Sequence, residues 1–285
     1  MKHSIVLGAD IGGSHITTAL IDQHSRSIIP GSLYRAHVNS HGSAGEIIKC
    51  WGDIIQKSLD TANGVNQIGI AMPGPLDYEA GISLIRGLHK YEALYGLNIK
   101  ELLAQQLQTE ARYIKIANDA RCFLQGELFN GAVKNQHTVT GLILGTGFGS
   151  AIAENGIARD ASFFETPFLA SRAEDYFCSR WFVKRYNELT SLQTVTNVKE
   201  IAALAATECP AAIAVFHEFG SNLALFLSLL RPTPELVLLG GNIAKTFSLF
   251  NPALQEGLNK YHLQISFVLS ILGEDAPLLG AASII

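Results

Sequence analysis

The sequence has few charged residues and no concentration of basic ones. Asp, Glu, Lys and Arg make up 16% of its 285 residues, hydrophobic residues make up 48%, and the formal net charge is −4. This composition excludes a disordered or fibrous protein and suffices for one large domain or two ordinary ones. The lack of Lys- or Arg-rich stretches argues against nucleic acid or an anionic membrane as the main partner.

Closely spaced cysteines and long apolar runs are also missing. Cys50, Cys122, Cys178 and Cys209 lie far apart, which excludes a zinc knuckle or a redox CxxC motif and indicates reduced thiols. The strongest apolar run near the C-terminus, residues 223–230, is far too short to span a bilayer. The N-terminal residues lack the long apolar region of a secretory signal. We therefore expect a cytoplasmic protein that does not enter a membrane.

Two common nucleotide-binding motifs are absent as well. There is no Gly-Lys-Ser/Thr sequence, so the chain has no P-loop. The GxGxG sequence at residues 145–149 is expected to lead into a strand, whereas a dinucleotide fingerprint needs GxGxxG leading into a helix. A nucleotide would have to be held by a different kind of turn.

The sequence does contain one pattern twice, in which two apolar runs flank a glycine-rich turn. Apolar runs 4–11 and 16–21 flank Gly12-Gly13, and runs 138–144 and 151–153 flank a glycine-rich turn. Each pattern predicts a β-hairpin, and helical periodicity follows each one. The other expected strands are 34–38, 67–72, 111–116 and 235–239, and the expected helices are 44–62, 99–107, 173–188, 198–207 and 211–230. We therefore predict two α/β domains of similar plan, with a boundary near residue 115.

Both glycine turns have the composition of a phosphate-binding loop. The first comprises Gly12, Gly13 and Ser14, and the second comprises Gly145, Thr146 and Gly147. Such turns let the backbone approach a ligand closely and direct several N–H groups at one point. One such turn alone is more often a simple tight hairpin, but two at matching places favour phosphate binding. Asp10, at the end of the first strand, is then a candidate to hold Mg²⁺ through water.

A candidate catalytic base follows the strand near residues 114–116. Asn118 and Asp119 come at its end, and an apolar helical pattern begins after them. Ligands of α/β proteins lie at the carboxyl ends of strands, so Asp119 is well placed to receive a proton from a substrate hydroxyl. Capping of the helix by Asn118 or Asp119 is an equally good explanation, and one residue can cap while the other reacts.

Taken in order, these motifs resemble those of the ROK family of sugar kinases, within the actin–hexokinase–heat-shock superfamily. The matching segments are Asp10–Ser14 with DIGGT, Met72–Asp77 with PGPLD, Asn118-Asp119-Ala120 and Gly126-Glu127 with NDAxxxxxGE, 144–149 with LTxGTGIGG, Gly240-Gly241-Asn242 with the adenosine motif, and 279–282 with the closing helix. Each motif alone is weak, but their order and spacing are specific to the family, and they cover nearly the whole chain.

The resemblance implies a fold and a set of roles. It implies two ribonuclease-H-like (actin-like ATPase) α/β domains, 1–115 and 116–285, with an interdomain cleft and a final helix, about 275–285, that packs back on the N-terminal domain. It also implies that ATP and Mg²⁺ are bound, with Gly240, Gly241 and Asn242 at the adenosine. Asp119 would be the catalytic base, and Asn118 and Gly74 would contact the sugar.

The sequence departs from the family around its acceptor and zinc motifs. Family members usually carry ExGH and then CxCGxxGCxE, whereas this chain retains only the two glutamates, as Glu165 and Glu174. These are expected to bind the sugar. If the alignment holds, Phe168 stands in place of the histidine and is expected to give the acceptor site an apolar surface. The alternative is that the alignment slips by a few residues around Pro167 and another group fills the histidine's place. The cysteine loop is missing, so we expect no structural zinc.

The function implied is an ATP-dependent, glucokinase-like sugar kinase that phosphorylates a hexose hydroxyl. An amino-sugar kinase, acting on N-acetylglucosamine or N-acetylmannosamine, is one alternative. A sugar-sensing regulatory protein without catalysis is another. The family's repressors carry an N-terminal helix-turn-helix, and with the first strand expected from about residue 4 we predict none here. The expected partners are a small-molecule sugar and ATP, with no nucleic acid and no membrane, and a homodimer stays open.

Overall fold

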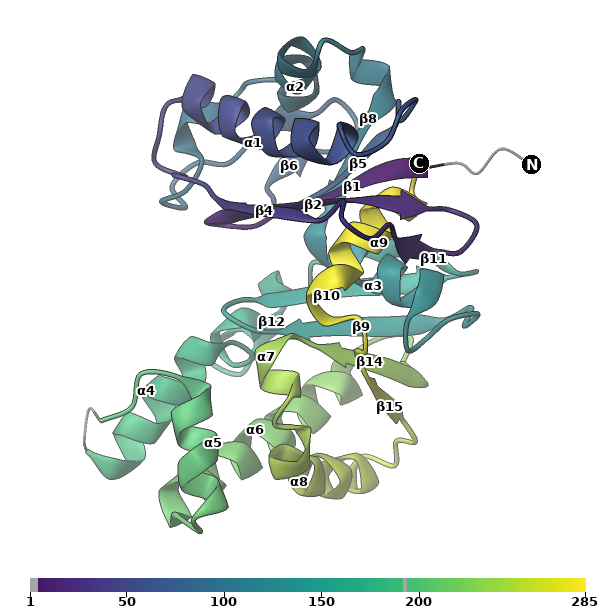
Figure 1. Cartoon of the computed structure of the whole chain (residues 1–285). Coiled ribbons are helices and arrows are strands. Elements are labelled where there is room, and N and C mark those ends of the chain that lie inside the picture. Colours follow the sequence, from purple (N-terminus) through teal and green to yellow (C-terminus); the bar gives the residue numbers. More distant parts are fainter. Residues whose placement is uncertain (1–4, 192–193) are drawn as a thin grey trace. The chain divides into compact units, whose positions relative to one another are not determined.

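The computed structural model describes residues 5–191 and 194–285, which divide into two compact units (Figure 1). The first unit runs to Gln136 and includes Gly156–Ala158 and Glu274–Ile285; the second comprises His137–Asn155 and Arg159–Gly273. Each unit is built on one mixed β-sheet with helices, so the predicted α/β class is confirmed. Residues 116–136 group with the first unit, and the domain boundary predicted near residue 115 stays a prediction.

The sheet of the first unit contains the predicted hairpin, and further strands pair on either side of it. Its strands are β1 (Ile5–Ile11), β2 (His15–Asp22), β3 (Ser27–Ile28), β4 (Tyr34–His37), β5 (Ile68–Met72) and β8 (Ile114–Asn118). β1 pairs with β2 antiparallel and with β5 parallel, and β5 pairs with β8 parallel. The carboxyl ends of β1, β5 and β8 therefore meet at one edge of this sheet. A separate short ribbon pairs β6 (Leu76–Asp77) with β7 (Ile82–Ser83).

Alternating residues of β1 explain how helices cover both faces of this sheet. Leu7, Ala9 and Ile11 are fully buried in a core that includes Trp51 of α1 (Ala44–Leu59). A capping box formed by Ser43 and Glu46 starts α1, and its apolar face is the one the periodicity predicts. Figure 1 shows α1 and α2 (Ile99–Leu107) on this face of the sheet, with α9 (Ala276–Ser283) on the other.

Glycines let α9 lie unusually close to the sheet and to α3 (Asp119–Asn130). A Cβ on Gly8 would lie 2.4 Å from the carbonyl oxygen of Leu278, and a Cβ on Gly69 would lie 1.9 Å from that of Ala281. Gly280 has the same relation to Cys122 of α3, at 1.7 Å. Real Cβ atoms do not come this close to backbone, so these positions need glycine. The last helix is therefore part of the first unit's core.

The second unit repeats the plan with a larger apolar core. Its strands are β9 (Val139–Leu144), β10 (Phe148–Glu154), β11 (Ile157–Asp160), β14 (Leu236–Gly240) and β15 (Ser266–Leu269), with a separate ribbon of β12 (Pro167–Phe168) and β13 (Ser171–Arg172). β9 pairs with β10 antiparallel and with β14 parallel. Its helices are α4 (Ser179–Thr190), α5 (Val198–Ala206), α6 (Pro210–Leu229), α7 (Gly241–Ala244) and α8 (Phe247–Lys260).

Aromatic side chains fill the core of the second unit. Phe177, Phe219 and Phe226 are fully buried, and the ring centroid of Phe177 lies 5.8 Å from that of Phe219 and 5.1 Å from that of Phe226. Each buried aromatic side chain contributes about 1.5–3 kcal/mol through the hydrophobic effect. Phe219 and Phe226 belong to α6, which among the described residues is long and apolar enough to cross a membrane by composition. Its burial in this core identifies it as a core helix, in line with the expectation of a soluble protein.

Candidate functional site

The first glycine turn connects β1 to β2 through Gly12, Gly13 and Ser14. The turn is closed by the N–H of Gly12, which donates to the carbonyl of His15 over 2.9 Å. Gly13 and Ser14 are exposed, and none of the three residues has a left-handed φ. A Cβ on Gly12 or Gly13 would meet only ordinary contacts, at 3.7 and 3.8 Å. The glycines are thus not needed by the fold here, and they leave space in front of the backbone.

Tyr91 supports this turn from behind. Its phenol donates to the carbonyl of Gly12 over 2.6 Å, and its ring stacks edge-on against Trp51. Desolvation by burial raises the pKa of Tyr91, so the phenol stays protonated and remains a donor. Lys90 lies at the front of the same turn, with its side chain beside Gly13. Neither residue could be identified from the sequence, because the loop that carries them has no periodic pattern.

Two carboxylates meet at the carboxyl edge of the first sheet. Asp10 is near the end of β1, and Asp119 follows β8 directly. The pKa of Asp10 is raised from 3.8 to about 7, first because burial desolvates the carboxylate and then because Asp119 lies near. Arg35 opposes this shift, but it is paired with Glu274 at 2.7 Å. A cation at this edge would relieve the repulsion between the two carboxylates.

The structure separates the roles of Asn118 and Asp119 that the sequence left open. Asn118 is the N-cap of α3, since its side-chain oxygen accepts the N–H of Arg121 at 3.0 Å. Its amide nitrogen lies 3.4 Å from the Tyr78 hydroxyl, which donates to the carbonyl of Met72. Asp119 is the first residue of α3, and one of its oxygens accepts the N–H of Ala120. Asn118 is therefore the capping residue.

Gly74 lies close to this group, beneath the Tyr78 ring. A Cβ on Gly74 would lie 3.0 Å from the Tyr78 hydroxyl oxygen, which is tighter than most real contacts. Gly74 thus lets the chain after β5 pass close to Tyr78, which in turn reaches Asn118. The first unit therefore brings together Asp10, Asn118, Asp119 and Gly74 around the carboxyl ends of three strands. Tyr78 was missed in the sequence, although it directly follows the PGPLD segment.

The second glycine turn connects β9 to β10 through Gly145, Thr146 and Gly147. The N–H of Gly145 donates to the carbonyl of Gly147 over 3.0 Å. Thr146 and Gly147 are exposed, and a Cβ on Gly145 would have no neighbour within 4 Å. The carbonyl of Gly145 accepts two bonds of 2.8 Å from Ser179, one from its N–H and one from its hydroxyl. The first turn of α4 is thereby fastened to the glycine turn.

Gly240, Gly241 and Asn242 lie beside this turn, because β14 runs parallel to β9 with Gly240 opposite Ile143. Gly241 has a left-handed φ of +83°, and a Cβ there would lie 2.3 Å from the carbonyl oxygen of Leu144. Both facts require glycine. Asn242 is exposed, and its side-chain oxygen accepts a bond of 2.9 Å from Lys245. The predicted adenosine motif is thus adjacent to the predicted phosphate turn in the second unit.

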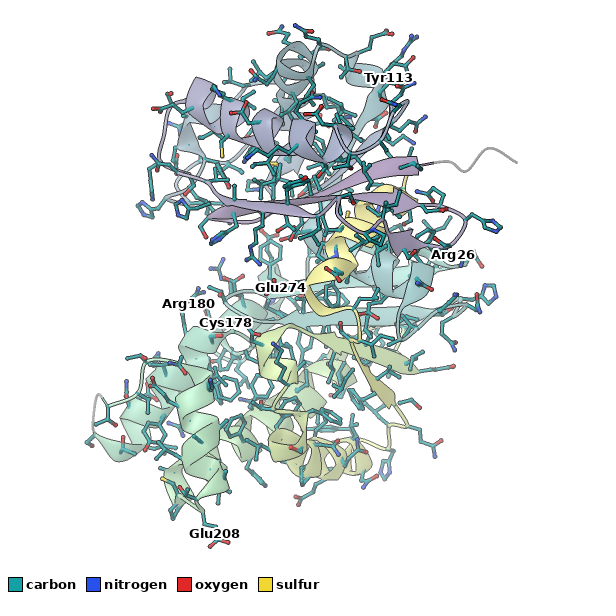
Figure 2. The ribbon with its side chains drawn as sticks, viewed as in Figure 1. Arg26, Tyr113, Cys178, Arg180, Glu208 and Glu274 are labelled. Carbon is teal, nitrogen blue, oxygen red and sulfur yellow. The ribbon has the colours of Figure 1, made fainter. Side chains whose placement is uncertain are left out.

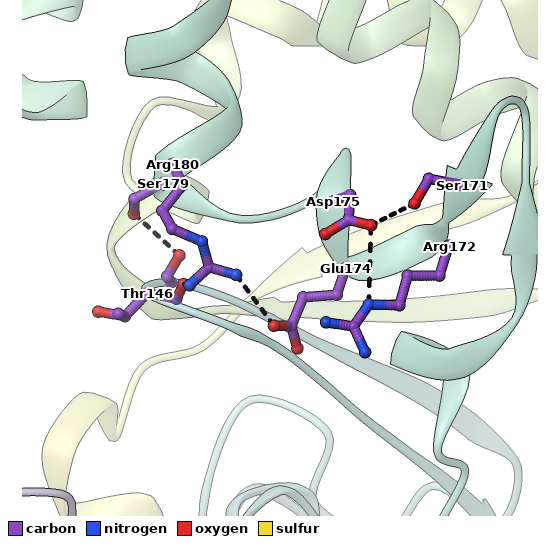
Figure 3. Close-up of polar contacts among 8 residues, drawn as sticks. Thr146, Ser171, Arg172, Glu174, Asp175, Ser179 and Arg180 are labelled. Carbon is purple, nitrogen blue, oxygen red and sulfur yellow. Dashed lines mark hydrogen bonds and ion pairs between the residues drawn. The ribbon is translucent and has the colours of Figure 1, made fainter. Parts of the chain in front are cut away.

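Glu165 and Glu174 lie on two 3-10 turns that contact each other, Phe163–Glu165 and Ala173–Asp175. The N–H of Ala173 donates to the carbonyl of Thr166 over 2.9 Å and joins the two turns. Glu174 is also next to the glycine turn, with one oxygen 3.7 Å from the position of a Cβ on Gly147. Its other oxygen forms an ion pair of 3.0 Å with Arg180 (Figure 3).

Phe168 does not give the site an apolar surface, and that expectation is wrong. Its side chain is 2% exposed and packs against Tyr176, Phe177 and Phe226, with centroids 5.2–5.6 Å apart. The physical reason is the ribbon of β12 and β13, because strand alternation leaves Pro167 exposed and directs Phe168 inward, while Leu169, in the turn between the two strands, is 60% exposed. Phe168 is therefore an anchor for the segment between Glu165 and Glu174.

The expectation of no structural zinc stays a prediction. Within residues 5–191 and 194–285, no three His, Cys, Asp or Glu side chains are grouped so as to hold a metal ion. Cys50, Cys122, Cys178 and Cys209 are free thiols in the structure. A magnesium ion held through water needs only one protein carboxylate, so Asp10 beside Asp119 fits such an ion.

Known proteins resemble this chain along most of its length. The sequence model of the ROK family matches residues 6–162. An N-acetyl-D-glucosamine kinase from Yersinia pseudotuberculosis is 26% identical over 271 residues, which cover 83% of each chain. The ROK hexokinase from Thermus thermophilus has a TM-score of 0.81 at 18% identity and covers 98% of this chain and 96% of its own.

A ROK glucokinase from Streptomyces griseus, solved with glucose and AMPPNP, has a TM-score of 0.76 at 20% identity and covers 98% of both chains. At these identities the two solved structures show the fold alone. They confirm the two-part, actin-like ATPase fold, in which each part is a ribonuclease-H-like unit that opens on a hairpin.

Proposed function

The chain belongs to the ROK family, and from this premise we propose that it is an ATP-dependent sugar kinase whose acceptor is an N-acetylhexosamine. The family match and the sugar kinases among its relatives support the kinase reaction. The relation to the N-acetyl-D-glucosamine kinase from Yersinia pseudotuberculosis supports the acceptor, since it extends over 83% of both chains. A glucokinase-like preference for glucose, expected from the motif set, is the alternative.

The observation that carries the proposal is the pair of glycine turns. Each closes a hairpin at the corresponding place in its unit, and a Cβ on any of the four glycines, Gly12, Gly13, Gly145 and Gly147, would meet nothing closer than 3.7 Å. Backbone N–H groups in such turns bind phosphate oxygens, and only glycine lets a phosphate approach the backbone this closely. We assign Gly12, Gly13 and Ser14 and Gly145, Thr146 and Gly147 to the phosphates of ATP, and Gly240, Gly241 and Asn242 to the adenosine.

The carboxylates of the first unit supply the chemistry. Asp119 accepts the proton of the attacking sugar hydroxyl, whose oxygen forms a bond to the γ-phosphorus while the bond from that phosphorus to the β-phosphate oxygen breaks. Because a carboxylate is a weak base for an alcohol, the proton moves late in the step. Asp10 would hold Mg²⁺ through water, and Mg²⁺ supplies charge neutralisation at the phosphates. Asn118, Gly74, Glu165 and Glu174 would position the acceptor.

The cellular setting follows from the same proposal. ATP and free sugars are found in the cytoplasm. The net charge of −4 argues against nucleic acid as a partner. We therefore propose a cytoplasmic enzyme with ATP and one sugar as its partners.

Steady-state assays of the purified protein test this function. We expect ADP release with ATP, Mg²⁺ and N-acetylglucosamine, with a higher kcat/KM than for N-acetylmannosamine or glucose. The variant Asp119→Asn is the control for contaminating kinases. A higher kcat/KM for glucose would show that glucose is the preferred acceptor, and the proposed kinase reaction would still stand. If the protein binds a sugar but forms no phosphate ester with any sugar of a broad panel, it is a sugar sensor and not a kinase.

A further inference from the structure

Arg180 contacts two neighbouring parts of the second unit, the second glycine turn and Glu174. It is the second residue of α4 and lies at the end of the helix that is fastened to the glycine turn (Figure 2). One guanidinium nitrogen is 3.4 Å from the carbonyl oxygen of Thr146, and another is 3.0 Å from a carboxylate oxygen of Glu174 (Figure 3). A single cation therefore contacts both the proposed phosphate turn and a proposed acceptor residue.

Glu174 poses an electrostatic problem for the proposed function. Its carboxylate lies against Gly147, and its side chain is only 22% exposed, so water screens it incompletely. A turn that binds phosphates should repel neighbouring anions, because two like charges a few ångströms apart repel strongly at low effective dielectric. An uncompensated Glu174 would therefore weaken the binding of ATP at this turn.

We propose that Arg180 is a positioning residue that neutralises Glu174, and so makes one turn compatible with both an acceptor carboxylate and a bound polyphosphate. This inference rests on the proposed function, because it assumes that ATP binds at the second glycine turn. Arg180 acts through Glu174, and its contact with Thr146 keeps the ion pair beside the turn.

A neighbouring ion pair shows that this arrangement is not a general property of the segment. Arg172 lies 3.7 Å from Asp175, and both side chains are about half exposed, at 52% and 42%. Asp175 also accepts a hydrogen bond from Ser171, and Figure 3 shows no hydrogen bond or ion pair from Arg172 or Asp175 to Thr146. The Arg172 pair thus provides a matched control with the same residue type and a similar place in the chain.

The test measures the equilibrium dissociation constant of MgATP without sugar, for five variants and the wild type. We expect Arg180→Gln to raise the Kd about tenfold at low salt, and by less at about 0.5 M salt because of screening. The double variant Arg180→Gln with Glu174→Gln should return to within about threefold of the wild type. Arg172→Gln should leave the Kd within the same range, whereas Glu174→Gln alone leaves the Arg180 charge unpaired beside the turn and should lower the Kd.

Three results would overturn the inference. If Arg180→Gln leaves the Kd unchanged, the ion pair has no effect on ATP. If the double variant stays as weak as Arg180→Gln, Arg180 contacts the phosphates itself or only supports the fold. Arg180→Lys keeps the positive charge, so this variant should bind MgATP more tightly than Arg180→Gln. If the two variants bind MgATP equally weakly, the charge of Arg180 does not act by neutralising Glu174. A wild-type protein that binds no MgATP would instead refute the proposed function.

Discussion

The two glycine turns share one plan but have opposite electrostatic surroundings. At the first turn, the carboxylate of Asp10 faces a second carboxylate, Asp119, and its pKa is raised to about 7 mainly by burial. At the second turn, the carboxylate of Glu174 is paired with the guanidinium of Arg180. A pair of carboxylates attracts a cation, whereas a neutralised carboxylate tolerates an anion. One hairpin design thus provides two different electrostatic environments.

The support behind the two turns also differs. The first turn is held by the phenol of Tyr91, which reaches across from a loop 79 residues away in sequence. The second is held by Ser179, at the start of a helix. We expect substitutions of the two carboxylates beside the first turn to change chemistry and proton affinity, and substitution of Arg180 beside the second turn to change the binding of ATP.

The largest expected effect is at Asp119. Asp119→Asn preserves the shape of the side chain and removes the base, so turnover should fall about 10²-fold or more. The KM for the sugar should change far less, since Asn118 and its cap remain. Steady-state kinetics at saturating ATP give both constants. Near-normal turnover would reduce Asp119 to a structural residue and would erase the contrast between the turns.

Asp10 should make the stability of the nucleotide-free protein depend on pH. Its folded-state pKa of about 7 exceeds the ordinary value of 3.8, so the folded state holds the proton more tightly. Wild-type stability from this group is therefore full below about pH 4 and is lost as the pH rises through about 7. Asp10→Asn avoids this loss and should be more stable than wild type by about 4 kcal/mol near pH 8, and by less than half of that near pH 5.

Thermal unfolding without Mg²⁺ or ATP measures this difference. Equal stabilisation by Asp10→Asn at both pH values would mean that the carboxylate titrates normally. Adding Mg²⁺ and ATP should reverse the order at the higher pH, because only the wild type can hold the ion through its carboxylate.

Phe168→His tests whether Phe168 contributes to the packing of the second unit's core and not to the acceptor site. Placing an imidazole among three aromatic rings leaves its polar nitrogens without water, at a cost of about 1–3 kcal/mol. The ratio of kcat/KM for glucose and N-acetylglucosamine should stay within about twofold of wild type. Leu169→Ala, at an exposed neighbour, is the control and should leave stability within about 0.5 kcal/mol. A large change in the ratio of kcat/KM values for the two sugars would indicate that Phe168 does line the acceptor site.

The smallest effects are expected from the open glycines. A Cβ on Gly13 or Gly147 meets nothing closer than 3.7 Å, so Gly13→Ala and Gly147→Ala should fold normally. Each methyl would keep a phosphate from the turn and cost about one charged hydrogen bond, or about tenfold in the KM for ATP. Unchanged KM values for both variants, with normal melting temperatures, would show that neither turn approaches a phosphate.

The sequence predicted the features that depend on local pattern. Gly-Gly between two apolar runs gave the first hairpin, and the apolar face of α1 followed from its period. Asp10 and Asp119 were expected at strand ends, and they meet because β1, β5 and β8 are parallel neighbours. The residues 99–107 were predicted as a helix and form α2 with the same bounds.

Features that depend on contacts distant in sequence were missed. α8 was not predicted, and Pro252 in its interior is a residue that usually ends a helix. A helix expected from residue 173 begins at Ser179, because Ala173–Asp175 forms a 3-10 turn that carries Glu174. Nothing in the sequence distinguishes Arg180 from any exposed arginine on a helix. Only the folded chain places it between Thr146 and Glu174.

The most direct test of the central claim is mass spectrometry of the product formed from ATP, Mg²⁺ and N-acetylglucosamine. We predict a sugar monophosphate with the wild type, formed in proportion to ADP, and a yield about a hundredfold lower at equal times with Asp119→Asn. A wild-type reaction that gives no phosphorylated sugar, or a variant that gives as much as the wild type, would contradict the account.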